Sequence, residues 1–127
     1  MTEKLIFVVD SDKKIQNLLE YTISGKEGFK VIVFPSGEEC LMNLDVNPDI
    51  IILDHLFTGK AKKMLNGMQT FSELRKINKA LQIIILSEKP NQKIIKELYV
   101  NDATNYISKN NYFIDSLLET IDRISQN

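Results

Sequence analysis

Three short apolar runs, each continuous and each ending at a polar residue, constrain the fold of this chain most strongly. The runs are Leu5 to Val9 before Asp10, Ile50 to Leu53 before Asp54, and Ile83 to Leu86 before Ser87. Uninterrupted apolar runs of this length are typical of parallel strands that are covered on both faces. All three fall far short of the roughly 18 residues that a membrane-spanning helix needs. They therefore predict the central strands of a buried parallel sheet.

Further segments extend this pattern to five alternating strand–helix units. Two more strands are expected at Phe29 to Phe34 and Thr104 to Ser108. Apolar residues at helical spacing predict helices over segments containing Ile15 to Ile23, Gly37 to Leu44, Gly67 to Ile77, Ile94 to Tyr99 and Ile114 to Ile124. Strands alternating with helices imply right-handed crossovers. The fold class is therefore α/β, a doubly wound parallel sheet with helices on both faces.

Composition excludes several other classes of protein. A length of 127 residues predicts one domain, and 43% hydrophobic residues are enough for its core. Sixteen basic and 17 acidic residues give a net charge of −1 without a basic run, which argues against nucleic-acid and membrane partners. The single cysteine, Cys40, excludes an intrachain disulfide and is expected to be buried. Without a secretory signal, the chain is expected to be cytoplasmic.

Polar residues at the strand ends form the candidate site. In a doubly wound sheet, ligands bind beyond the carboxyl ends of the strands. Those ends contribute Asp10, Ser11, Asp12, Asp54, Ser87 and Lys109. Clustered carboxylates repel one another unless a cation lies between them, and a few carboxylates suit Mg²⁺ in phosphoryl chemistry. A hydroxyl and an ammonium can bind the oxygens of a transferring phosphoryl group or of an aspartyl phosphate.

Four motifs carry a resemblance to a known family. They are Phe7-Val8-Val9-Asp10, Ile51-Ile52-Leu53-Asp54, Ile84-Ile85-Leu86-Ser87 and Asn105-Tyr106-Ile107-Ser108-Lys109. In this order, each at the end of its own strand, they resemble the receiver domains of two-component response regulators, in particular single-domain chemotaxis regulators. The resemblance implies a flavodoxin-like sheet of strand order 2-1-3-4-5. It also implies that residues 1–127 form one receiver domain with no output domain in this chain.

The resemblance further implies roles for individual residues. Asp54 would accept a phosphoryl group from a histidine kinase or a histidine phosphotransfer protein. Asp10, Asp54 and the backbone carbonyl of Leu56 would hold Mg²⁺, with Ser11 or Asp12 as a further candidate ligand. Ser87 and Lys109 would bind the phosphoryl group. Ser87 and Tyr106 would form a switch that remodels the surface of the fourth helix, fifth strand and fifth helix, where an effector protein docks. Such a protein is a phosphoryl acceptor that assists its own phosphorylation and dephosphorylation, and is not an ordinary enzyme.

The sequence departs from the family pattern at several places. Ser11 stands where the family has a second adjacent acid, and Asp12 is expected to cap the first helix. Asn110 follows Lys109 where proline is usual, so we expect a trans peptide bond there. The segment Gly59 to Asn66 lengthens the approach to the third helix.

These departures keep two alternatives open. A degenerate receiver would bind its partner without being phosphorylated, so Asp54→Ala would leave binding unchanged. Alternatively, Asp10-Ser11-Asp12 also resembles the Asp-x-Asp motif of haloacid-dehalogenase-type phosphatases, with Asp10 as the nucleophile. Identifying the aspartate that becomes phosphorylated separates the phosphatase from the receiver.

Overall fold

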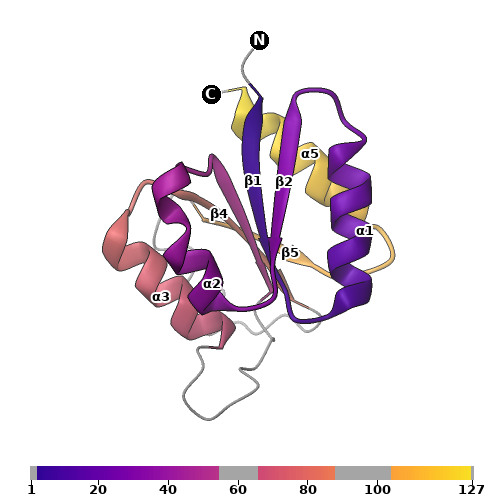
Figure 1. The fold of residues 1–127 in the computed structure, drawn as a ribbon. Helices are drawn as coiled ribbons and strands as arrows, with labels where there is room; N and C mark the ends of the chain where they lie inside the picture. Colours follow the sequence, from indigo (N-terminus) through magenta and orange to yellow (C-terminus); the bar gives the residue numbers. More distant parts are fainter. Residues whose placement is uncertain (1–2, 55–65, 88–103, 127) are drawn as a thin grey trace.

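A parallel sheet lies between two layers of helices (Figure 1). The computed structural model describes residues 3–54, 66–87 and 104–126. The strands are β1 (Lys4–Val9), β2 (Phe29–Phe34), β3 (Ile50–Asp54), β4 (Gln82–Ser87) and β5 (Thr104–Ser108). The helices are α1 (Lys13–Ser24), α2 (Gly37–Met42), the short 3₁₀ helix η1 (Leu44–Val46), α3 (Gly67–Ile77) and α5 (Phe113–Ser125). Parallel pairing in the order β2-β1-β3-β4-β5 confirms the predicted fold class.

The sheet separates two hydrophobic cores, because successive strand residues point to opposite faces. In β1, Phe7 and Val9 belong to the core on one face, whereas Ile6 and Val8 belong to the core on the other. All four side chains are completely buried. The continuous apolar runs of the sequence thus reflect a sheet that is covered on both sides.

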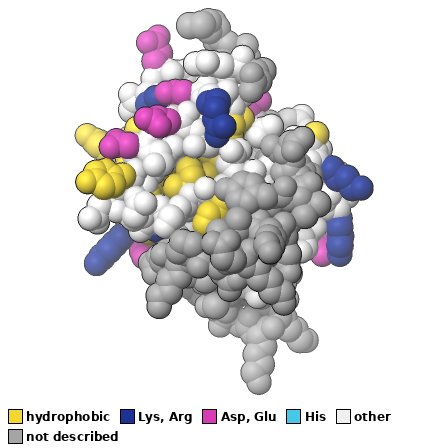
Figure 2. All heavy atoms as spheres, turned by 180° about the vertical axis from the view of Figure 1, so that it is seen from behind, with side chains coloured by type: hydrophobic (Ala, Val, Ile, Leu, Met, Phe, Trp, Pro, Cys, Tyr) yellow, Lys and Arg dark blue, Asp and Glu magenta, His cyan; other side chains and the backbone are white. Residues whose placement is uncertain are grey.

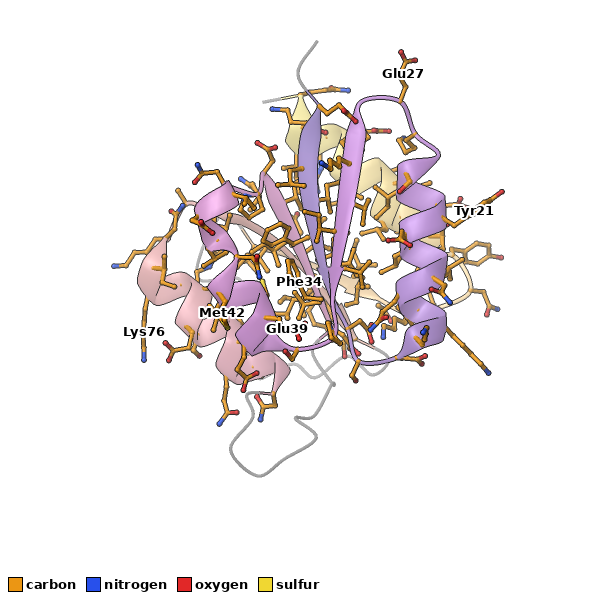
Figure 3. All side chains as sticks on the ribbon, in the orientation of Figure 1. Tyr21, Glu27, Phe34, Glu39, Met42 and Lys76 are labelled. Atoms are coloured by element: carbon orange, nitrogen blue, oxygen red, sulfur yellow. The ribbon has the colours of Figure 1, made fainter. Side chains whose placement is uncertain are left out.

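The first core lies between the sheet and helices α2 and α3. Phe34 lies between the sheet and α2 (Figure 3), and its ring contacts that of Phe7 edge-on, with centroids 4.7 Å apart. Helix α2 contributes Cys40, and α3 contributes Phe71 and Leu74. Cys40 is buried and has a free thiol, as predicted.

The second core lies between the sheet and helices α1 and α5. Leu19 and Ile23 of α1 and Leu117 and Ile121 of α5 are fully buried against it. Leu18, which belongs to the same predicted stripe, is 40% exposed because it lies at the edge of the buried face of α1.

Three details refine the sequence interpretation. Helix α2 ends at Met42, earlier than predicted, and the chain continues as η1 until Asn47 adopts a left-handed conformation with a φ of 60°. The helix expected around Ile94 to Tyr99 lies outside the described residues. Within the ranges that the structure covers, every helix is too short or too polar to cross a membrane.

Candidate functional site

The carboxyl ends of the strands lie at the end of the molecule away from the two termini (Figure 1). Asp10 follows β1, Asp54 closes β3, Ser87 closes β4 and Lys109 follows β5. The strand register aligns these ends, since Val9 pairs with Leu53, Asp54 with Leu86 and Ser87 with Ser108. Parallel pairing therefore brings residues from four distant parts of the sequence to one edge.

Lys109 joins the two carboxylates of this edge. Its Nζ lies 3.4 Å from Asp54 Oδ1 and 3.8 Å from Asp10 Oδ2. The side chains are shielded from solvent, with exposed fractions of 9% for Lys109, 10% for Asp54 and 1% for Asp10. Charges interact more strongly in such a shielded place than in water. The ammonium group therefore offsets part of the repulsion between the two carboxylates.

Asp10 is held by its backbone and by one side-chain oxygen. Its N–H donates to the carbonyl of Phe34 at 3.2 Å, and its Oδ1 accepts from the Asp12 N–H at 2.8 Å. Gln16, on the first turn of α1, donates from Nε2 to the Asp10 carbonyl. This role of Gln16 was missed by the sequence interpretation, because no motif marks a residue that acts on a backbone carbonyl.

Burial raises the pKa of Asp10 to about 6. The hydrogen bond from the Asp12 N–H opposes this shift because it stabilises the ionised carboxylate. The negative charge of Asp54 raises the pKa further, and the positive charge of Lys109 lowers it. Without a bound cation, the protein therefore stabilises the ionised form of Asp10 less well than water does.

The donor set at this edge is compatible with a divalent cation. Asp10 Oδ2 is buried and accepts no hydrogen bond, and its ammonium neighbour is 3.8 Å away. In the described part of the chain, no group of three His, Cys, Asp or Glu side chains forms a complete protein cage. One or two carboxylates with an incomplete cage are what Mg²⁺ commonly uses, because it retains several waters.

The other candidate ligands differ in position. Asp12 caps α1, with its carboxylate accepting from the Lys14 N–H at 2.8 Å, as predicted for a capping residue. Ser11 lies between Asp10 and this cap and is half-buried. Leu56, whose carbonyl was a predicted ligand, lies outside the described residues.

Ser87 and Tyr106 occupy defined positions on β4 and β5. Ser87 is fully buried, and its carbonyl accepts from the Lys109 N–H at 2.8 Å. Tyr106 is half-buried and packs against the first core, on the face covered by α2 and α3. The peptide bond between Lys109 and Asn110 is trans, as expected.

Comparison with known proteins gives a consistent match. A sequence model described as "Response regulator receiver domain" matches residues 6–122. The transcriptional regulatory protein CpxR of Klebsiella pneumoniae is 34% identical over 80 residues, which are 63% of this chain and 32% of that protein. The match thus spans about a third of the length of this relative.

Solved structures show the same fold. Chemotaxis protein CheY4 of Vibrio cholerae superposes with a TM-score of 0.82 at 21% identity, covering 97% of this chain and 99% of that one. Response regulator TrrA of Thermotoga maritima, solved in complex with Mg²⁺-BeF, superposes with a TM-score of 0.77 at 28% identity, covering 95% and 98%.

Proposed function

This chain belongs to the family of response regulator receiver domains of two-component systems, and we propose that Asp54 is its phosphoryl acceptor in a Mg²⁺-dependent reaction. Receiver domains are phosphoryl acceptors and not classical enzymes. The observation that carries the proposal is the ion-pair bridge from Lys109 to Asp54 and Asp10. This bridge gives the acceptor carboxylate a cationic neighbour that can also bind an incoming phosphoryl group.

In the proposed reaction, a carboxylate oxygen of Asp54 attacks the phosphorus atom of a phosphohistidine. A P–O bond forms to Asp54 as the P–N bond breaks, and the imidazole leaves. Lys109 places its positive charge where negative charge develops on the phosphoryl oxygens, which stabilises the transition state. Ser87, at the end of the neighbouring strand, supplies a hydroxyl on the same edge. Hydrolysis returns Asp54 to its carboxylate when water attacks phosphorus.

Asp10 and Asp54 would hold Mg²⁺ at this edge, with Leu56, Ser11 and Asp12 as further candidates from the sequence. When bound, the metal supplies positive charge to the phosphoryl oxygens. Asp10 Oδ2 is buried and accepts no hydrogen bond. A bound cation would compensate this buried oxygen, which supports the assignment. A cation also offsets the carboxylate repulsion that Lys109 only partly relieves.

The proposed partners are a histidine kinase or phosphotransfer protein as donor and an effector protein downstream. Tyr106 and Ser87 are the proposed switch residues, since they lie on adjacent strands that lead to the site. The balance of 16 basic and 17 acidic residues favours a protein partner over nucleic acid, and the described part of the face seen in Figure 2 carries side chains of both charges. A basic patch, in contrast, is the usual footprint of nucleic-acid binding.

Incubation with acetyl phosphate and Mg²⁺, followed by mass mapping of the modified residue, tests the proposal. We expect phosphate on Asp54 when Mg²⁺ is present. No phosphate should form when EDTA is added before acetyl phosphate. The Asp54→Asn variant should remain unmodified, and Lys109→Met should be modified much more slowly. Phosphate on Asp10 would instead support the phosphatase alternative. Absence of modification in the wild-type protein would contradict the proposed function.

A further inference from the structure

The turn between β5 and α5 fixes the position of Lys109. Asn110 takes part in most of the hydrogen bonds of this turn. The Lys109 N–H donates to the carbonyl of Ser87 at 2.8 Å, which continues the β4–β5 ladder one residue past the end of β5. Directly afterwards, the Asn110 N–H donates to the carbonyl of Ser108 at 2.8 Å. Lys109 is therefore the central residue of a tight three-residue turn that is closed by Asn110.

Asn110 also connects this turn to the start of α5. Its side-chain Oδ1 accepts from the Tyr112 N–H at 2.8 Å, and its carbonyl accepts from the Phe113 N–H at 3.2 Å. An asparagine side chain that accepts from the N–H two residues later mimics a backbone turn. The N-cap position of α5, Tyr112, makes no side-chain capping bond of its own. Asn110 therefore supplies the side-chain bond at this helix start.

Packing contributes little to holding the part of the turn that follows Lys109. Asn110, Asn111 and Tyr112 are all exposed, and Tyr112 is 72% exposed. By contrast, the side chain of Lys109, which precedes these three residues, is only 9% exposed, and Phe113 after them packs against the second core. An exposed junction between two fixed ends depends on its local hydrogen bonds for a single conformation.

We propose that Asn110 is a positioning residue for Lys109. By closing the turn with its backbone and tying it to α5 with its side chain, Asn110 keeps the Lys109 ammonium beside Asp54. This inference rests on the proposed function only for its consequence, which is faster phosphoryl transfer to Asp54. Its structural part, the fixed backbone of Lys109, stands independently of phosphorylation.

The test compares Asn110→Ala with Asn111→Ala, a matched change at the adjacent exposed asparagine. Amide hydrogen exchange measured by NMR reports on the turn. We expect Asn110→Ala to accelerate exchange of the Tyr112 and Lys109 amides, and Asn111→Ala to leave both unchanged. Asn110→Ser retains a neutral oxygen acceptor and should restore part of the protection. Unchanged exchange of the Lys109 amide in Asn110→Ala would overturn the proposal, whether or not the protein is phosphorylated.

The second readout is the rate of phosphorylation by acetyl phosphate at saturating Mg²⁺. We expect Asn110→Ala to lower this rate about two- to tenfold, the range that loss of one hydrogen bond supports. The Mg²⁺ dissociation constant should change little, because Lys109 is not a metal ligand. A rate equal to that of wild type would overturn the catalytic consequence of the proposal. A wild-type protein that is not phosphorylated at all would overturn the proposed function instead, while the exchange data still test the turn.

Discussion

At the scale of single residues, Asp10 is under-stabilised because it is a buried carboxylate beside a second carboxylate. Its pKa rises from an ordinary 3.8 to about 6, mainly through burial. The folded protein therefore binds a proton more tightly than the unfolded chain, and ionisation of Asp10 destabilises the fold as pH rises between these two values. The raised pKa corresponds to a free-energy difference on the order of 3 kcal/mol.

Asp10→Asn should therefore raise the free energy of unfolding in the absence of Mg²⁺. The gain should be fully present above pH about 6, shrink as pH falls, and vanish below the ordinary pKa of 3.8, where Asp10 is protonated in both states. Urea unfolding over a pH series measures it. A variant that is no more stable than wild type at neutral pH would show that Lys109 fully compensates the buried charge.

Ser11 is the second residue whose chemistry can be tested directly. It lies half-buried next to Asp10, where the family has an acid. Ser11→Asp adds a carboxylate to the proposed donor set, and each added negative charge strengthens the attraction for a divalent cation. We expect the variant to bind Mg²⁺ several-fold more tightly in an NMR titration and to lose stability without the metal. Unchanged Mg²⁺ affinity would indicate that residue 11 points away from the cation.

At the scale of elements, the contact between α2 and α3 depends on a glycine. A Cβ atom at Gly37 would lie 1.9 Å from Thr70 Oγ1 and 3.0 Å from Thr70 Cβ. Thr70 is completely buried, and its hydroxyl donates to the Asn66 carbonyl at 2.8 Å, so it has little freedom to move aside. These two helices can therefore approach this closely only because Gly37 has no side chain.

Gly37→Ala should destabilise the protein by about 1–3 kcal/mol, because the extra methyl group overpacks this contact. Urea unfolding measures the loss. In Gly37→Ala/Thr70→Ala, part of the loss should be recovered, so that the two changes are less than additive. Strict additivity would show that the steric conflict is relieved elsewhere.

Strands were more predictable from the sequence than the features that join them. The five predicted segments located every strand to within a residue, and the three central strands gave the clearest signal, since burial on both faces leaves a continuous apolar run. The start of α3 carries a capping box between Asn66 and Gln69 that the apolar pattern did not indicate. Arg75 was also missed, although its guanidinium donates to the carbonyl of Leu81 and to Thr104 Oγ1 and so ties α3 to β5. Such bonds depend on tertiary proximity and leave no periodic signal.

For the candidate site, the sequence located the strand-end residues but not their support. Asp10, Asp54 and Lys109 were predictable because each follows or ends a strand of a parallel sheet. The hydrogen bonds of Gln16 to the Asp10 carbonyl and of Asn110 to the turn were not, because they arise from the geometry of two loops.

At the scale of the whole molecule, the two cores share the same strands, so neither can lose its packing without disturbing the other. Cys40 lies in the first core, and burial raises the pKa of its thiol to about 12. Leu117 lies in the second core on α5. Labelling of the buried Cys40 thiol therefore detects whether weakening the second core, on the opposite face of the sheet, also opens the first core.

Leu117→Ala should lower the stability of the fold by about 2–5 kcal/mol through loss of buried contacts. If the domain opens cooperatively, the same change accelerates thiol labelling of Cys40 under native conditions. The exposed Tyr21, which projects away from α1 (Figure 3) and is 83% exposed, provides a control through Tyr21→Ala, which should leave labelling unchanged. Labelling that is insensitive to Leu117→Ala would indicate that α2 opens separately.

In the proposed function, Lys109 and Asp54 bind one phosphoryl group between them. A crystal structure of the protein with Mg²⁺ and beryllofluoride tests it most directly, because this anion mimics a phosphoryl group on a carboxylate. We expect beryllium bonded to Asp54, with the Lys109 ammonium within hydrogen-bond distance of one of its fluorides. A structure in which beryllofluoride is bound to Asp10, or in which Lys109 remains away from the bound anion, would contradict the claim.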